Sequence, residues 1–506
     1  MSRTKNATRN IISGLISKMV YLVFPFIIRS VIIQTLGSEY LGLSSLFTSI
    51  LQVLNLAEMG FSGAIIYSIY KPIAERDMVT VCGLMNLYKK IYRIIGIIIL
   101  LIGLAIMPFL PNLIEGNVPV GANIYMLYML YLFNTVSTYF LFAYKGALLN
   151  AYQRNDIASN IYTLTGFLRF IGQIVVLLVF KNYYVYVIVQ CITSILNNIV
   201  VAIVVKQKYP KCVCCGEVSK EQKKDIRKKV TGIMIQKICI TTRNSFDSIF
   251  ISSMVGLTAV AIYSNYYMIM VAVASIIGIL ASSIKASVGN SIVTESVEKN
   301  YNDMNKFNFV YMWISGWLTV CLVCLYQPLM EMWMGGDNMF SYAIVILFCI
   351  YFYSLECGEI RFVYTEAKGL WYENKHYDIL EAILNIVLNL VLGHFFGVYG
   401  IIIGTLLSLL IINFGCGSRV LFKYYFTSQK VSEYFLRHGL YALVTVIICV
   451  ITYFVCSMVR FDGVLGFTIK GLICIGLPNI LYIVAYRNTK MFGEATRFVK
   501  KILRKR

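Results

Sequence analysis

The chain has 506 residues, of which 58% are hydrophobic and 14% are charged, and its mean hydropathy is +0.73. Soluble domains are about 45 to 50% apolar and about 25% charged, so the composition excludes a water-soluble protein. The formal net charge of +21 does not indicate nucleic-acid binding, because the Lys and Arg residues lie in short connectors, where they set membrane topology and meet anionic lipid.

The apolar runs predict membrane-spanning helices. Residues 1–10 are short and basic, and the apolar run 11–36 that follows has no small-residue cleavage site, which indicates a retained first span and not a signal peptide. Many later runs approach the roughly 20 residues that cross hydrocarbon. We predict an all-α integral membrane protein with about 14 transmembrane helices, at residues 11–35, 40–69, 91–110, 121–148, 157–180, 183–205, 230–254, 257–284, 308–333, 340–364, 377–396, 398–420, 437–458 and 464–486.

Alternate connectors differ in charge. The connectors on one side are rich in Lys and Arg, as in 206–229 and the tail 487–506. Those on the other side contain almost no Lys or Arg, as in 111–120. Lys181 and Arg460 are exceptions. Because basic connectors stay inside, we predict that both termini are cytoplasmic. No outer connector is long enough to fold as a domain, which argues against an enzyme that must hold a sugar in a soluble loop.

An internal repeat divides the chain. An offset of 219 residues (256 minus 37) places Leu36-Gly37 over Val255-Gly256 and Lys18 over Lys237. The same offset places the fifth and sixth spans over the eleventh and twelfth. Because an even number of spans separates the copies, we predict parallel six-helix repeats, an arrangement typical of carriers. The predicted parts are an N-lobe, a basic cytoplasmic linker, a C-lobe, and two terminal helices with a basic tail, at residues 1–206, 207–229, 230–425 and 426–506.

The fourteen cysteines do not form a recognisable site. Many lie inside apolar runs, where they are expected to act as small hydrophobic residues. Cys212, Cys214 and Cys215 cluster in the basic linker but lack the paired C-x-x-C spacing of zinc sites. We therefore predict reduced thiols, no metal and no cofactor.

Several segments resemble one family of exporters. The turn at 36–43 has the sequence LGSEYLGL, and residues 54–61 have the sequence LNLAEMGF. These segments resemble polysaccharide exporters of the multidrug, oligosaccharidyl-lipid and polysaccharide (MOP) superfamily, with Wzx-type flippases as the nearest branch. Further segments of the same pattern lie at 10–14, 84–92, 247–263, 385–389 and 397–400.

The resemblance implies a MATE-like fold, with twelve core helices in two lobes around a central cavity and two additional C-terminal helices. It implies a flippase of the bacterial cell membrane that moves undecaprenyl-pyrophosphate-linked oligosaccharide repeat units to the outer leaflet for capsule or other cell-surface polysaccharide. The partners implied are the lipid bilayer, this lipid-linked saccharide and a polysaccharide polymerase, with the chain as a monomer. Lipid II flippases and multidrug or cation antiporters share the fold and remain alternatives.

Charged residues inside spans mark the predicted cavity, because each costs from about 3 kcal/mol at membrane depth. An anionic pyrophosphate requires cations. The alternatives are that Arg243 and Asp247 form a structural pair and that Lys18 and Arg29 extend to the membrane interfaces. The predicted cationic lining is Arg243, Arg169, Lys237, Arg29 and Lys18, and Thr241 and Asn244 share the polar face of the seventh span.

Few carboxylates lie inside spans. Asp247, Glu58, Glu356 and Glu359 are candidates for binding a coupling proton or sodium ion. For Glu356 and Glu359 we favour neutralisation of Arg361. Membrane potential is an alternative drive, because each negative charge moved outward gains about 2.3 kcal/mol per 100 mV.

Overall fold

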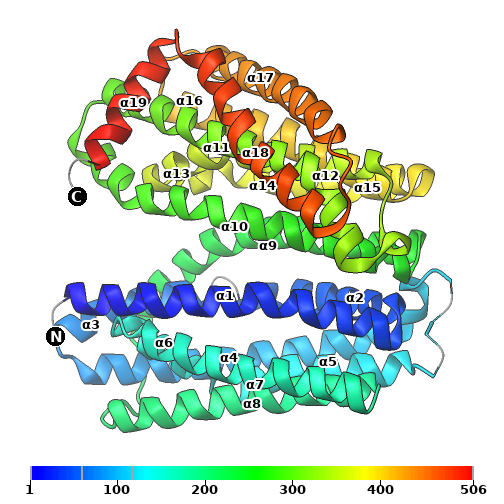
Figure 1. Cartoon of the computed structure of the whole chain (residues 1–506). Helices are drawn as coiled ribbons and strands as arrows, with labels where there is room; N and C mark the ends of the chain where they lie inside the picture. The colour runs from blue at the N-terminus through cyan, green and yellow to red at the C-terminus, as the bar shows by residue number, and fades with distance from the viewer. Residues whose placement is uncertain (1–2, 59–60, 117, 120, 504–506) are drawn as a thin grey trace. The chain divides into compact units, whose positions relative to one another are not determined.

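The computed structural model describes residues 3–58, 61–116, 118–119 and 121–503. Within these residues the chain is helical and contains no strand. The chain forms two compact units, residues 1–261 and 262–506, each with a hydrophobic core of its own (Figure 1). The prediction of an all-α fold is confirmed.

The first unit is a bundle of long helices joined by short turns (Figure 1). Polar caps begin several of these helices: Asn182 accepts hydrogen bonds at the start of α8, and Ser219 forms a capping box with Gln222 at the start of α9. The elements are α1 (Arg3–Leu36), α2 (Ser38–Leu54), η1 (Asn55–Glu58), α3 (Phe61–Ala74), α4 (Met78–Ile106), η2 (Met107–Leu113), α5 (Ile124–Phe140), η3 (Ala143–Lys145), α6 (Gly146–Ala151), α7 (Asn155–Val179), α8 (Tyr183–Lys208) and α9 (Lys220–Met254).

Helix α10 (Leu257–Thr294) begins in the first unit and continues into the second. In the second unit α14 packs along α15, while α17 and α18 pack on α11. The other elements of this unit are α11 (Val297–Met334), η4 (Gly336–Asn338), α12 (Tyr342–Cys357), α13 (Glu359–Lys368), α14 (Trp371–Phe396), α15 (Val398–Ser408), η5 (Leu409–Cys416), α16 (Gly417–Tyr424), α17 (Val431–Ser457), α18 (Gly463–Tyr486) and α19 (Lys490–Leu503).

The number of spans differs from the sequence prediction. Among the described residues, 11 helices are long and apolar enough to cross a membrane, or 12 if α5 and the segment 143–151, bent by 48°, count as one span. The predicted span 40–69 is divided into α2, η1 and α3. The predicted span 230–254 lies in α9 and carries three charged residues, Lys237, Arg243 and Asp247. The predicted count of fourteen is therefore not confirmed.

The turns at the two ends of the 219-residue offset both contain a glycine with positive φ. Gly37 lies between α1 and α2 with φ 99°, and Gly256 lies between α9 and α10 with φ 115°. Side chains other than glycine rarely adopt such angles, so both turns depend on the same residue type. The first unit includes α9 and ends within α10, and the lobe boundaries drawn from the sequence stay a prediction.

The motif at residue 10 fastens α1 to α7. The Asn10 side chain accepts a hydrogen bond from the backbone N–H of Asp156 at 2.7 Å and donates one to the carbonyl of Gln153 at 3.2 Å. Arg154 pairs with the Asp156 carboxylate at 2.9 Å. These contacts fix the start of α7 beside α1, and the two helices then pack along their length.

Candidate functional site

The interface between α1 and α7 is built from aromatic rings. The Tyr21 ring stacks on the Tyr162 ring with centroids 4.2 Å apart, and the Phe24 ring stacks on the Phe170 ring at 5.0 Å. Gly166 leaves room for the Tyr21 hydroxyl, which would collide with any side chain at that position. The hydroxyl donates to the carbonyl of Tyr162 at 3.2 Å. This packing sets the position of Arg169, which follows on the same helix.

Arg169 lies on these rings. Its guanidinium carbon is 4.7 Å from the centroid of the Phe170 ring and 5.5 Å from that of Tyr21, within the range of cation–π attraction. Its buried Nε has no hydrogen-bond partner among the described residues. Arg169 also lines a cavity of about 220 Å³ whose other walls are mostly hydroxyl and amide groups, from Tyr21, Thr138, Tyr162, Thr165, Gly166, Thr193, Ser194, Asn197 and Asn198.

Tyr186 connects Arg169 to a second predicted cation. This buried tyrosine of α8 interacts electrostatically with both Arg169 and Arg29. Arg29 also interacts with Tyr183, whose hydroxyl lies 2.8 Å from that of Tyr131. Two of the five predicted cations, one from α1 and one from α7, thus lie in electrostatic range of a single tyrosine of α8.

The remaining cationic candidates lie in two environments. On α9, Arg243 and Asp247 are buried, with 6% and 1% of their surfaces exposed. Lys18 and Lys237, which the 219-residue offset superimposes, are both exposed, as interfacial lysines are. Thr241 is half-buried, and the side chain of Asn244 lies outside the described residues. The division of these residues between binding and structural roles stays a prediction.

Glu58 is held by tyrosines. It ends η1, and its carboxylate accepts hydrogen bonds from the hydroxyls of Tyr92 on α4 and Tyr139 on α5, the latter at 2.6 Å. Tyr88 donates to Tyr92 at 2.9 Å, which extends the chain of hydroxyls. The sequence identified the carboxylate, and the structure adds its donors. Hydrogen bonds in such a chain polarise and strengthen one another.

Glu356 and Arg361 belong to different hydrogen-bond groups in the second unit. Glu356 is buried on α12 and accepts from the Tyr311 hydroxyl at 2.5 Å. Arg361 instead donates to Asn413 at 2.8 Å, and Asn413 donates to Glu381 at 2.8 Å. The interpretation of Glu356 as the counterion of Arg361 is therefore wrong, because the carboxylate points to a tyrosine of α11. Glu359, half-buried at the start of α13, does interact electrostatically with Arg361.

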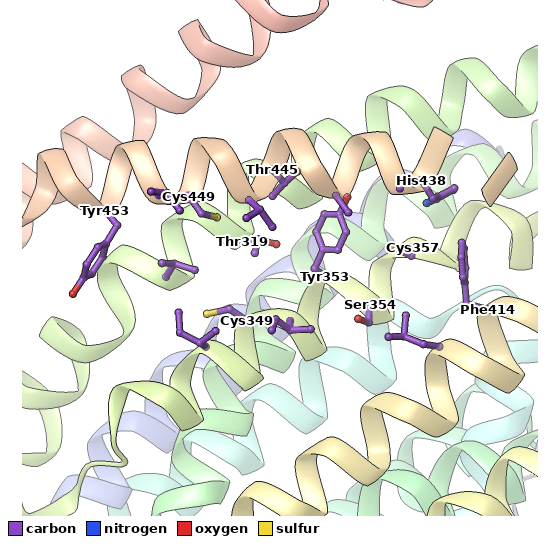
Figure 2. Close-up of a pocket in the computed structure, with 18 of the residues that line it drawn as sticks. Thr319, Cys349, Tyr353, Ser354, Cys357, Phe414, His438, Thr445, Cys449 and Tyr453 are labelled. Atoms are coloured by element: carbon purple, nitrogen blue, oxygen red, sulfur yellow. The ribbon is translucent and has the colours of Figure 1, made fainter. Parts of the chain in front are cut away.

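An apolar cavity of about 790 Å³ lies between α11, α12, α17 and the π-helical segment η5. Figure 2 shows side chains of α17, from His438 to Tyr453, facing those of α12, from Cys349 to Cys357. Phe414 of η5 closes the end beside His438. Polar groups in the wall are few, namely the side chains of Thr319, Ser354, His438, Thr445 and the tyrosines. This cavity suits a hydrocarbon chain.

The linker cysteines do not converge. Cys212 and Cys214 are half-buried and Cys215 is exposed. Burial, together with the neighbouring Cys82, raises the pKa of the Cys212 thiol to about 12, which keeps it protonated. In the described part of the chain, the cysteines close enough to share one ion lie elsewhere, in the second unit.

Three further functional candidates lie outside the residues predicted from the sequence, for different reasons. Glu381 is a carboxylate inside an apolar span and could have been found by the same rule as Glu58. Asn413 is recognisable only through the π-helical turns, which the sequence pattern does not indicate. Tyr186 is one of 37 tyrosines, and only the packing of α1, α7 and α8 distinguishes it.

Comparison with known proteins identifies the family. A family model described as "Polysaccharide biosynthesis protein" matches residues 7–284, more than half of the chain. The chain belongs to the polysaccharide biosynthesis protein family. The family predicted from the resemblance is thus confirmed. No curated protein sequence matches this chain.

Solved structures share the fold at low sequence identity. The lipid II flippase MurJ, in an inward closed conformation, has a TM-score of 0.66 and 16% identity, covering 95% of this chain and 99% of that one. An inward-facing MATE family multidrug resistance transporter has a TM-score of 0.60 and 15% identity, covering 81% and 98%. A MOP superfamily transporter from Pyrococcus furiosus has a TM-score of 0.52 and 15% identity, covering 83% and 96%. The predicted MATE-like membrane fold is confirmed.

Proposed function

We propose that this member of the polysaccharide biosynthesis protein family is a flippase for an undecaprenyl-pyrophosphate-linked oligosaccharide repeat unit, which it moves from the cytoplasmic to the outer leaflet. The observation that carries the proposal is the Arg169 guanidinium in a cavity lined by hydroxyl and amide groups, with Arg29 and Arg169 both in electrostatic range of Tyr186. A pyrophosphate that leaves water must regain charge-assisted hydrogen bonds, and guanidinium groups supply them in pairs.

The surroundings of Arg169 support a headgroup that contains sugar as well as phosphate. The two aromatic rings hold the guanidinium in place before cargo arrives, which reduces the entropy lost on binding. Thr165 and Asn197 lie in the same cavity wall, with 3.1 Å between Oγ1 and Oδ1. Hydroxyl and amide groups of this kind pair with sugar hydroxyls.

The apolar cavity of the second unit supports a lipid-linked cargo. Its walls are almost entirely hydrocarbon, sulfur and aromatic (Figure 2), so a polyprenyl chain would displace no strongly bound water there. A soluble sugar nucleotide would gain nothing from such a surface, because burying its polar groups without partners is unfavourable.

The proposed mechanism is alternating access. The headgroup enters an inward-open state, the lobes rock, and the headgroup leaves on the outer side, with no bond made or broken. Two drives fit the chemistry. One is a proton or sodium ion at Glu58, and the other is the membrane potential acting on the anionic cargo, worth about 2.3 kcal/mol per charge per 100 mV.

The test uses a strain in which the chromosomal copy is depleted and plasmid variants are supplied. We expect depletion to accumulate the lipid-linked intermediate on the inner leaflet, Arg169→Ala to fail to relieve it, and Arg169→Lys to relieve it partly. Arg93→Ala is the matched control, because Arg93 is an exposed arginine of the same unit. Export by Arg169→Ala equal to that of the control would reject the proposed site.

The same strain distinguishes the alternatives. Accumulation of lipid II in place of a saccharide intermediate would assign the protein to cell-wall precursor transport. Unchanged lipid intermediates combined with altered dye efflux would assign it to the multidrug or cation antiporters. A polymerase partner and a monomeric state are part of the proposal, and crosslinking in native membranes tests both.

A further inference from the structure

Three buried cysteines from three different helices meet in the second unit. They are Cys324 of α11, Cys456 of α17 and Cys474 of α18, with 5%, 3% and 0% of their surfaces exposed. Their sulfur atoms all lie within 4.8 Å of one another. The Sγ atoms of Cys456 and Cys474 are 3.9 Å apart, so the thiols face one another across the helix interfaces.

The spacing matches that of thiolates around a metal ion. Zinc–sulfur bonds are about 2.3 Å long, so three sulfurs in a plane around zinc are about 4.0 Å apart. We propose that Cys324, Cys456 and Cys474 form a binding site for a thiophilic divalent cation, Zn²⁺ in the first instance. Ordinary packing of three small apolar residues does not require their sulfurs to converge on one point.

The local charge favours a divalent ion. Three thiolates and Zn²⁺ carry a net charge of −1, and Lys470, one helical turn before Cys474 on α18, interacts electrostatically with Cys456. Together these groups are neutral, which matters because uncompensated charge is costly in an apolar interior. With Cu⁺ in place of Zn²⁺, the three thiolates, the ion and Lys470 would together carry one negative charge. Binding of Zn²⁺ releases the three thiol protons to solution.

A fourth thiol, that of Cys321, lies near the cluster but outside the group of three converging sulfurs. The Sγ of Cys321, one turn before Cys324 on α11, lies 3.8 Å from the carbonyl oxygen of Cys474. The site would join the terminal helices α17 and α18 to α11. It is independent of the proposed transport function, because neither Arg169 nor the apolar cavity includes any of these ligands.

The test measures metal binding directly on the full-length protein in detergent under reducing conditions. Zinc is determined by mass spectrometry after equilibration with a zinc-buffering chelator. We expect one bound zinc ion per wild-type protein. We expect this ion to be lost in Cys324→Ser, Cys456→Ser and Cys474→Ser. Cys191→Ser is the matched control, because Cys191 is a buried cysteine, 5% exposed, in the first unit.

Two further measurements keep the proposal testable if a variant misfolds. Co²⁺ added to the wild type should give an intense sulfur-to-metal charge-transfer band, which Zn²⁺ then removes. The triple variant Cys212→Ser, Cys214→Ser, Cys215→Ser should keep its one bound zinc ion per protein. Loss of the zinc with that linker variant, absence of the cobalt band, or a Cys456–Cys474 disulfide in the reduced preparation would each overturn the proposal.

Discussion

The hydroxyl of Tyr139 lies 2.6 Å from a carboxylate oxygen of Glu58. This contact joins α5 to the short helix η1, and Tyr92 of α4 donates to the same carboxylate. The carboxylate thus accepts hydrogen bonds from two helices at once, α4 and α5. This relationship makes Glu58 the most testable coupling candidate of the first unit.

Replacement of Glu58 by Gln should uncouple transport from an ion gradient. Gln keeps the shape of the side chain but cannot take up a proton or offer a charge to sodium. We expect Glu58→Gln vesicles to lose the acceleration that an imposed proton or sodium gradient gives the wild type. Glu115→Gln, at an exposed glutamate of the same unit, should keep it. An unchanged response in Glu58→Gln would leave membrane potential as the drive.

Substitution of Gly166 should damage the α1–α7 interface. An added Cβ would collide with the Tyr21 hydroxyl, and overpacking of this kind costs about 1–3 kcal/mol. We expect Gly166→Ala to lower the thermal unfolding temperature in detergent, and Tyr21→Phe to recover only part of the loss, because it removes the hydroxyl but leaves the ring carbon Cζ 2.7 Å from the added Cβ. Gly14→Ala is the control on α1, where a Cβ meets nothing within 4 Å. Equal unfolding temperatures for the two alanine variants would contradict the packing argument.

Asn413→Leu should destabilise the second unit. Asn413 bridges the buried Arg361 and Glu381, and a buried polar group that loses its partner costs about 1–3 kcal/mol, more if it is charged. The measurement is thermal unfolding, with Asn488→Leu as a control at an exposed position. If the bridge matters, replacing Arg361 and Glu381 together by apolar residues in the Asn413→Leu background should recover part of the loss. Failure of Asn413→Leu to differ from the control would show that the bridge contributes little.

Filling the apolar cavity should block a lipid-linked cargo. Ala442 lines the cavity on α17, so Ala442→Trp places an indole in the space proposed for the polyprenyl chain. Leu443→Trp adds the same ring on the same helix at a residue that is 57% exposed. We expect the first variant alone to accumulate the lipid intermediate, with both proteins present in the membrane at wild-type levels. Normal export by Ala442→Trp would remove the cavity from the proposed path of the cargo.

The sequence predicted the membrane fold because apolar length and connector charge are strong local signals. The glycine turns at Gly37 and Gly256 could be matched for the same reason, since helix pairs separated by only one or two residues leave a recognisable pattern. The count of spans was harder to predict. Helix α9 is polar enough to fall outside simple hydropathy limits, and the stretch 40–69 contains a break at η1 that its uniform composition does not reveal.

Individual residues of the candidate site could be predicted from the sequence, but their contacts with one another could not. The cost of charge in a membrane identified Arg29, Arg169 and Glu58, but their partners are tyrosines, which are common throughout the chain. Arg361 shows most clearly that the partner of a charged residue cannot be predicted from its neighbours in sequence. Its neighbours in sequence include Glu359, yet its hydrogen bond goes to Asn413 in a segment 52 residues away. Pairing across such separations depends on helix packing, which hydropathy does not encode.

The π-helical segment Leu409–Cys416 also affects how relatives of this chain should be aligned. A π turn accommodates one more residue than an α turn, and one residue corresponds to about 100° of rotation around the axis. Gly417, which lies directly against the Arg361 guanidinium, follows this segment at the start of α16. A homologue one residue shorter between α15 and α16 would thus present a different face from α16 onward, and gap placement in this segment decides which of its residues correspond to Gly417.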